Sequence, residues 1–195
     1  MRGPPSGTCR LPGTSLLPLV LAVFALSVTG EARSQAVPRS QHATVSQMVG
    51  RTEIAVSYSR PVARGRVLFG DDGVVHWGRV WTPGADSATR ISFSRDVLVE
   101  GKEVKQGSYS VWLVPRGGEF WGLILSRAAH VWHIPYPGDG QDALRADVRP
   151  ESGSHMEVLA LYFPIVAPDS AVLRIHWGET VVPVRIRAPL PGDGR

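Results

Sequence analysis

Hydrophobic and polar residues alternate along most of the chain after about residue 40, and this period of two is typical of half-buried β-strands. In the segment 53–59, Ile54, Val56 and Tyr58 fall on one face, and small or polar residues fall on the other. Arg60 continues the apolar face, at the point where a following proline ends regular strand pairing. We therefore expect the Arg60 guanidinium at the rim of a hydrophobic core.

The same alternation, interrupted by clusters of Gly, Pro, Asp and Ser, predicts a series of short strands. They are expected at 43–49, 53–59, 74–81, 88–94, 96–100, 103–105, 108–114, 119–125, 144–148, 155–163, 171–177 and 180–186. A tight hairpin turn is expected at Gly178-Glu179, and a single helical turn at 126–129. About ten short antiparallel strands without an amphipathic helix predict an all-β fold, a β-sandwich or jelly roll, in a single domain over residues 43–188.

The two ends of the chain have a different composition. Residues 1–36 have the pattern of a secretory signal peptide, with arginines near the start, an apolar run at 16–28 and a small-residue cleavage site at Ser34-Gln35-Ala36. That run of about 13 residues is shorter than the roughly 20 that a membrane-spanning helix needs. We expect a periplasmic or extracellular protein after cleavage, and a disordered Pro/Gly-rich tail at 189–195.

Composition excludes several classes of function. The only cysteine, Cys9, lies in the predicted leader, so the mature chain would have no disulfide, no thiol nucleophile and no Cys-ligated zinc. The leader also contains three arginines and one glutamate, so the 21 basic and 17 acidic residues of the whole chain fall to 18 and 16. A net charge of about +2 gives no electrostatic case for nucleic-acid binding.

The segment from Tyr58 to Asp86 is the richest part of the chain in residues that could bind a ligand. Its arginines alternate with aromatic residues, and guanidinium groups bind carboxylate, sulfate or phosphate through paired hydrogen bonds. Aromatic faces can pack against a sugar ring or beneath an arginine. The candidate ligand-binding residues are Tyr58, Arg60, Arg66, Trp77, Trp81, Asp86, Trp132 and His133. The alternative is a bracing role, in which Arg60, Arg64, Arg66 and Arg79 pair with Asp71, Asp72, Asp86 or Asp96.

A metal site is not expected. His130 and His133 are three residues apart, and Asp139 or Asp142 could add a third zinc ligand. However, Trp132 interrupts the helix that would bring the two histidines to one side, as does a nearby proline, and there is no His-Glu-x-x-His motif. We therefore predict neither a metal nor a cofactor.

Catalysis is also poorly supported by the sequence. There is no Gly-x-Ser-x-Gly motif, and the adjacent Asp71 and Asp72 point apart, unlike the facing acids of glycosidases. We interpret the chain as a non-catalytic module that binds a small anionic or carbohydrate ligand. A cell-envelope hydrolase that uses Asp86 with His76 or His133 is one alternative, and a structural or protein-interaction domain is another.

The chain contains an ordered set of short motifs. They are Tyr58-Ser59-Arg60-Pro61, Arg64-Gly65-Arg66, Phe69-Gly70, Trp77-Gly78-Arg79-Val80-Trp81, Gly84-Ala85-Asp86 and Gly107-Ser108-Tyr109-Ser110-Val111, followed by the Pro115 turn and Trp121. This set resembles a bacterial secreted family of domains of unknown function, DUF2911. The resemblance implies export and a β-rich fold, and no activity. The chain departs from the family pattern in having Thr82-Pro83 where Arg-Thr is usual, and Asp86 where Asn is usual.

Overall fold

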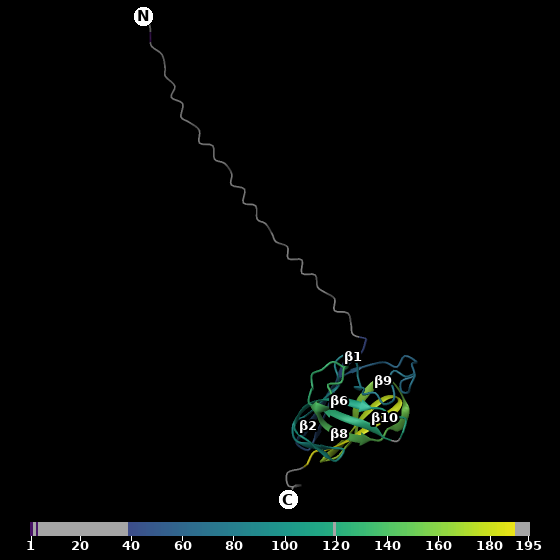
Figure 1. Ribbon diagram of the computed structural model, residues 1–195. Coiled ribbons are helices and arrows are strands. Elements are labelled where there is room, and N and C mark those ends of the chain that lie inside the picture. The colour runs from purple at the N-terminus through teal and green to yellow at the C-terminus, as the bar shows by residue number, and fades with distance from the viewer. Residues whose placement is uncertain (2, 4–38, 119, 190–195) are drawn as a thin grey trace. The chain divides into compact units, whose positions relative to one another are not determined.

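The computed structural model describes residues 1, 3, 39–118 and 120–189, and the account below concerns residues 39–189. The described residues form ten strands in two antiparallel sheets, which confirms the predicted all-β single domain (Figure 1). Apart from Met1 and Gly3, the predicted signal peptide lies outside the described residues, as do residues 190–195 of the predicted tail. No helix among the described residues is long and apolar enough to cross a membrane.

The larger sheet has six strands and the smaller has four. The order in the larger sheet is β1 (Gln41–Val49), β2 (Thr52–Arg60), β3 (Arg90–Phe93), β6 (Gly107–Val114), β7 (Trp121–Ser126) and β8 (Asp142–Val148). The order in the smaller sheet is β5 (Lys102–Val104), β4 (Val97–Val99), β10 (Ser170–Arg187) and β9 (Glu151–Val166). One short 3₁₀ helix, η1 (Asp139–Gln141), precedes β8.

The two sheets enclose one hydrophobic core, as a β-sandwich requires. Ile54 of β2 and Leu113 of β6 are fully buried in it, together with Leu159 and Leu173 of the opposite sheet. Arg60 lies at the edge of this core, where its Nε donates to the carbonyl oxygen of Leu159 at 2.9 Å. The alternation in β2 therefore predicted both the buried face and the rim arginine correctly.

Residues 61–89 connect β2 to β3 without forming a regular strand, so the predicted strand at 74–81 is wrong. Only isolated bridges occur in the segment, and they are Val62–Val158, Phe69–Val75, Trp81–Leu113 and Ser87–Trp132. Gly70 and Gly78 have positive φ angles of 127° and 71°, which turn the backbone away from an extended path. The covered apolar residues of the segment, such as Leu68, Phe69 and Val75, are covered because they pack on the sandwich, and not because they alternate within a sheet.

Five aromatic rings hold this segment in place. Phe69 lies at their centre, with its ring centroid 5.9 Å from Trp81, 5.2 Å from Trp121 and 6.3 Å from Trp177. Trp81 stacks on Trp177 at 6.1 Å, and Trp77 meets Trp121 edge-on at 6.1 Å. Trp121 belongs to β7 and Trp177 to β10, so this aromatic cluster ties the segment to both sheets.

Two smaller sequence predictions are also wrong. Gly178 has a left-handed φ of 58°, yet it lies in a bulged region inside β10 and does not end a hairpin. A turn and a bulge both favour glycine in this conformation, so the sequence does not separate them. A Cβ atom at Gly178 would also lie 2.8 Å from Cδ1 of Leu68. The helical turn expected at 126–129 is absent, and the only helical residues described are those of η1.

We predict that Phe69→Ala lowers the free energy of unfolding by about 3 kcal/mol, because it removes the ring at the centre of the aromatic cluster. Urea unfolding followed by tryptophan fluorescence measures this change. Phe120→Ala is the matched control: that ring is 47% exposed and contacts only the Arg149 guanidinium among the interactions described, at 5.9 Å. Phe120→Ala should lower the free energy of unfolding by less than about 1 kcal/mol. Equal effects of the two variants would show that the cluster does not secure the segment.

Candidate functional site

The segment 61–89 forms one wall of a hollow of about 480 Å³, here called the basic cleft. The lining residues are strongly biased toward positive charge, because arginines and histidines line the cleft and no described acidic residue does. They are Arg39, Ser40, Pro61, Val62, Arg64, Arg66, Val74, Val75, His76, Arg79, Val80, Trp81, Gly84, Ala85, His133, Ile134 and Trp177. The cleft therefore combines positive charge with apolar and aromatic walls.

The arginines of the cleft are not neutralised by acids. Arg66 donates from Nε to the carbonyl oxygen of Ala63 at 2.9 Å, and from Nη2 to that of Val62 at 2.7 Å. These acceptors hold the guanidinium in position and leave its charge uncompensated. The side chains of Arg64 and Arg79 form no hydrogen bond or ion pair with any described residue. The bracing alternative requires ion pairs between these arginines and nearby aspartates. The described contacts of Arg60, Arg64, Arg66 and Arg79 include no such pair.

The backbone at the start of the cleft wall is anchored to β9. The N–H group of Arg64 donates to Oε1 of Glu157 at 2.7 Å, and the N–H group of Ala63 donates to the Glu157 carbonyl oxygen at 2.8 Å. Oε2 of Glu157 also contacts Nε2 of His155 at 3.0 Å. That contact, and then the Arg64 N–H group, lower the pKa of Glu157 below its usual value. The carboxylate therefore anchors the loop backbone, and the charge of Arg64 makes a smaller contribution to the same lowering of its pKa.

Two histidines of the cleft are oriented by backbone carbonyl groups. Nδ1 of His133 lies 2.6 Å from the carbonyl oxygen of Asp86, and Nδ1 of His76 lies 2.9 Å from that of Asp71. A carbonyl oxygen only accepts, so each Nδ1 carries the proton and donates it. Each Nε2 atom forms no hydrogen bond with a described residue, so the ring edge that lines the cleft keeps a polar atom for another partner.

Asp86 shapes the backbone of the site. Its φ of 60° is left-handed, a conformation that Asp and Asn tolerate better than most residues. Its carbonyl oxygen accepts from both the N–H group and the ring of His133. The pair that the hydrolase hypothesis requires, a carboxylate on an imidazole, is not among the described hydrogen bonds of Asp86.

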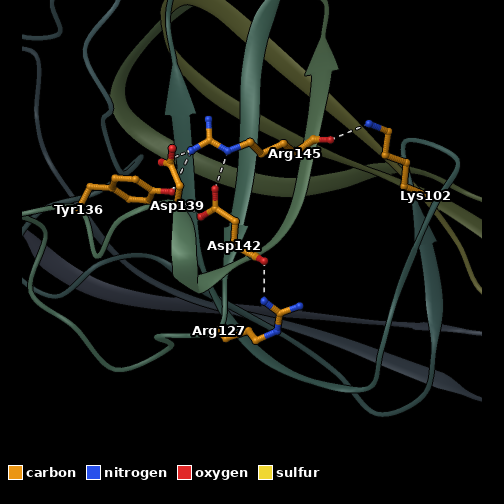
Figure 2. Close-up of polar contacts among 6 residues, drawn as sticks. All are labelled: Lys102, Arg127, Tyr136, Asp139, Asp142 and Arg145. Carbon is orange, nitrogen blue, oxygen red and sulfur yellow. Dashed lines mark hydrogen bonds and ion pairs between the residues drawn. The ribbon is translucent and has the colours of Figure 1, made fainter.

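A polar network fixes the loop that brings His133 to the cleft. Figure 2 shows Arg145 of β8 between the carboxylates of Asp139 and Asp142, with N···O distances of 2.5 Å to each. The Tyr136 hydroxyl group donates to Oδ1 of Asp142, and Nη1 of Arg127 donates to the Asp142 carbonyl oxygen at 2.5 Å (Figure 2). Both ends of the loop 127–141 are therefore tied to the start of β8, and the loop's middle reaches the cleft.

A second hollow of about 460 Å³ lies on the exposed side of β1, β2 and β3 and is here called the His42 hollow. Its lining has hydroxyl and imidazole groups, one arginine and one exposed indole, and again no described acidic residue. The residues are His42, Ser57, Tyr58, Ser59, Ser87, Ala88, Arg90, Ala129, His130, Val131 and Trp132.

The structure separates the predicted site residues into three groups: those that line the basic cleft, those that line the His42 hollow, and those that line neither. Arg66, Trp81 and His133 line the basic cleft, and Tyr58 and Trp132 line the His42 hollow. Arg60, Trp77 and Asp86 line neither: Arg60 braces β9, Trp77 packs on Trp121, and Asp86 positions His133.

Sequence reasoning missed several lining residues. Arg39 and the whole group of His42, Ser57, Arg90 and His130 were not predicted as site residues. The only signal for Ser57 and Arg90 was their outward position in alternating strands, which is the usual position of any polar residue in a sheet. Among the described residues, no group of three or more His, Cys, Asp or Glu is placed to hold a metal ion.

Comparison with models of protein families assigns the chain to a family. Residues 40–186 match the family described as "Protein of unknown function (DUF2911)". The chain belongs to this family. The match runs from the residue before β1 to Ile186 in β10, so every lining residue of the basic cleft and of the His42 hollow except Arg39 lies within the DUF2911 domain. No curated protein and no solved structure matches the chain.

We predict that Asp142→Asn lowers the pKa of Tyr136. Burial is the main reason that this pKa is raised from 10.0 to about 12, and the hydrogen bond to Asp142 is the next. The variant's pKa should therefore fall while staying above 10.0, because the contribution of burial remains. NMR titration of ¹³Cζ-labelled tyrosine measures this value, and Tyr136→Phe assigns the signal. An unchanged pKa in Asp142→Asn would show that the network of Figure 2 does not hold the ring.

The same shift has a consequence for stability. The folded protein favours the neutral phenol, so the stabilisation is fully present below the pKa of the unfolded chain, near 10. It is lost as the pH rises through the folded value of about 12. Tyr136→Phe should therefore reduce the loss of stability between about pH 10 and 12 in urea titrations.

Proposed function

We propose that this DUF2911 domain is an exported, non-catalytic module that binds a small anionic ligand in the basic cleft. One observation carries the proposal: four arginines, Arg39, Arg64, Arg66 and Arg79, line one hollow, and none forms an ion pair with a described carboxylate. The hollow therefore gathers positive charge that no described ion pair offsets, and this supports an anionic ligand. Export rests on the signal-peptide pattern of residues 1–36.

The chemistry of the cleft favours a ligand with two parts. Guanidinium groups present paired donors that match carboxylate, sulfate or phosphate, and these charge-assisted bonds are stronger than neutral ones. The exposed part of Trp81 and the side chains of Val80 and Ile134 supply apolar area beside the charges. Ligand pockets commonly combine apolar walls with a few fixed polar groups. An anionic group attached to a ring or a short apolar body satisfies both parts.

The hydrolase hypothesis remains the second candidate. His76 and His133 both line the cleft with a free Nε2 atom, which is the position that a general base would need. Against it, the described hydrogen bonds join His133 to the carbonyl oxygen of Asp86, and a carbonyl group cannot stabilise an imidazolium as a carboxylate does. Turnover of ester, phosphoester or glycoside substrates that disappears in His133→Ala would favour this candidate. A structural or protein-interaction domain is the third, and it requires no small ligand.

We predict that Arg79→Ala and Arg64→Ala each weaken binding of an anionic ligand by about 10- to 100-fold, because each loses hydrogen bonds to a charged group. Isothermal titration calorimetry with inorganic sulfate, inorganic phosphate and galacturonate, at low salt, measures the affinities. Neutral galactose serves as the uncharged probe and should not bind comparably.

Arg51→Ala is the matched control variant. Arg51 lies in the turn before β2, at the opposite end of that nine-residue strand from Arg60 and the cleft. The control removes the same charge about 30 Å away and should leave the affinity unchanged. Failure of all three anions to bind, or equal losses in Arg51→Ala and Arg79→Ala, would overturn the proposed function.

A further inference from the structure

The basic cleft and the His42 hollow adjoin each other. Four chain segments pass from one to the other, each contributing neighbouring residues to both. In the His42 hollow these residues are His42, Ser57-Tyr58-Ser59, Ser87-Ala88 and Val131-Trp132. Their respective neighbours in the basic cleft are Arg39-Ser40, Pro61-Val62, Gly84-Ala85 and His133-Ile134. The two hollows therefore share their walls along one side of the domain.

The boundary between them is a short, firmly paired piece of backbone. Ser87 and Trp132 form a bridge, the N–H group of Ala88 donates to the Val131 carbonyl oxygen at 3.0 Å, and that of His133 donates to Asp86 at 2.9 Å. The ring of Trp132 lines one hollow and that of His133 lines the other, with centroids only 5.3 Å apart. A single elongated molecule can therefore contact both hollows across this boundary.

The His42 hollow is suited to groups that both donate and accept hydrogen bonds. Nη1 of Arg90 lies 2.9 Å from Nδ1 of His130, and since guanidinium only donates, Nδ1 accepts and the proton of the neutral ring is on Nε2. Nε2 of His42 contacts Oγ of Ser57 at 2.9 Å. Hydroxyl groups have the same dual character, and sugars present them in rows. The 56% exposed indole of Trp132 adds an apolar face beside these groups.

We propose that the two hollows together form an extended site for an acidic oligosaccharide, a chain of sugars that carry carboxylate or sulfate groups. One acidic sugar would occupy the basic cleft, and the following sugar would occupy the His42 hollow. This inference rests on the proposed function and extends it, because it names the ligand class and adds a second subsite. The absence of described acids from both linings favours anionic over neutral sugars, since neutral sugars gain from carboxylate acceptors.

A nucleic acid fits these observations less well. Single-stranded nucleic acid is bound by several aromatic faces in succession, on which successive bases stack. Among the described tryptophan and tyrosine residues that line the two hollows, only Trp132 is exposed, while Trp81 is half-buried and Trp177 and Tyr58 are buried. The hydroxyl and imidazole groups of the His42 hollow instead match sugar hydroxyls.

Calorimetry with uronic-acid oligomers of increasing length tests the inference. Monomer, dimer and tetramer of galacturonate, mannuronate and guluronate are titrated into the full mature domain. We expect at least one series to bind about tenfold or more tightly on going from monomer to tetramer, because the second subsite becomes occupied. In the double variant Arg90→Ala/Trp132→Ala the monomer should bind as before, and the gain with length should be lost.

The control is Arg51→Ala/Phe120→Ala, which removes the same two kinds of side chain from outside both hollows, and it should keep the gain. If the monomers bind and the tetramers bind no more tightly, the second subsite is refuted while the proposed function stands. If no uronate of any length and no inorganic anion binds, both fail. Tighter binding of an oligothymidylate or an oligoglutamate than of every uronate tetramer would overturn the assignment to sugars.

Discussion

The packing of five aromatic rings around Phe69 is the interaction on which the candidate site depends. The segment 61–89 forms no regular strand, and backbone hydrogen bonds join it to the sheets only at separate points, as between Trp81 and Leu113. Between these points, ring contacts with Trp121 and Trp177 fix its position relative to the sheets. Burial of rings of this size is among the largest stabilising terms in a core. With the rings fixed in the core, the polar side chains between them are left to line the surface of the cleft.

That arrangement concentrates like charge, which is normally unfavourable in a folded protein. Arg66 is held by carbonyl oxygens and Arg64 only through its backbone, so the fold positions the guanidinium groups without neutralising them. Elsewhere, Arg145 pairs with two aspartates and Arg187 pairs with Asp169. However, Arg60, Arg95 and Arg127 donate to carbonyl oxygens, as Arg66 does. Arginines without an acidic partner are therefore not confined to the cleft, and the cleft differs in that four of them line one hollow with no described acid. This concentration of charge is the main reason that we propose a ligand there.

The sequence predicted those features of the fold that depend on local alternation of apolar and polar residues. The inward face of β2, the rim position of Arg60 and the hairpin of β4 and β5 follow from alternation and turn residues alone. It failed where long-range packing decides the outcome, as in the 74–81 segment and at Gly178. The candidate site was predicted only in part for the same reason: Arg66, Trp81 and His133 meet in space because the aromatic cluster and the network around Arg145 bring two distant loops together, and no sequence spacing records that.

The most direct test of the central claim is the arginine side-chain spectrum, in which ¹⁵Nε–H signals are followed by NMR while digalacturonate is added. Our account predicts that the signals of Arg64 and Arg79 shift and saturate together, because these guanidinium groups form no described hydrogen bond or ion pair and would bind the ligand. The signal of Arg51 should stay unchanged. Shifts confined to Arg51 and other arginines outside the cleft, or no shift in any arginine, would contradict the account.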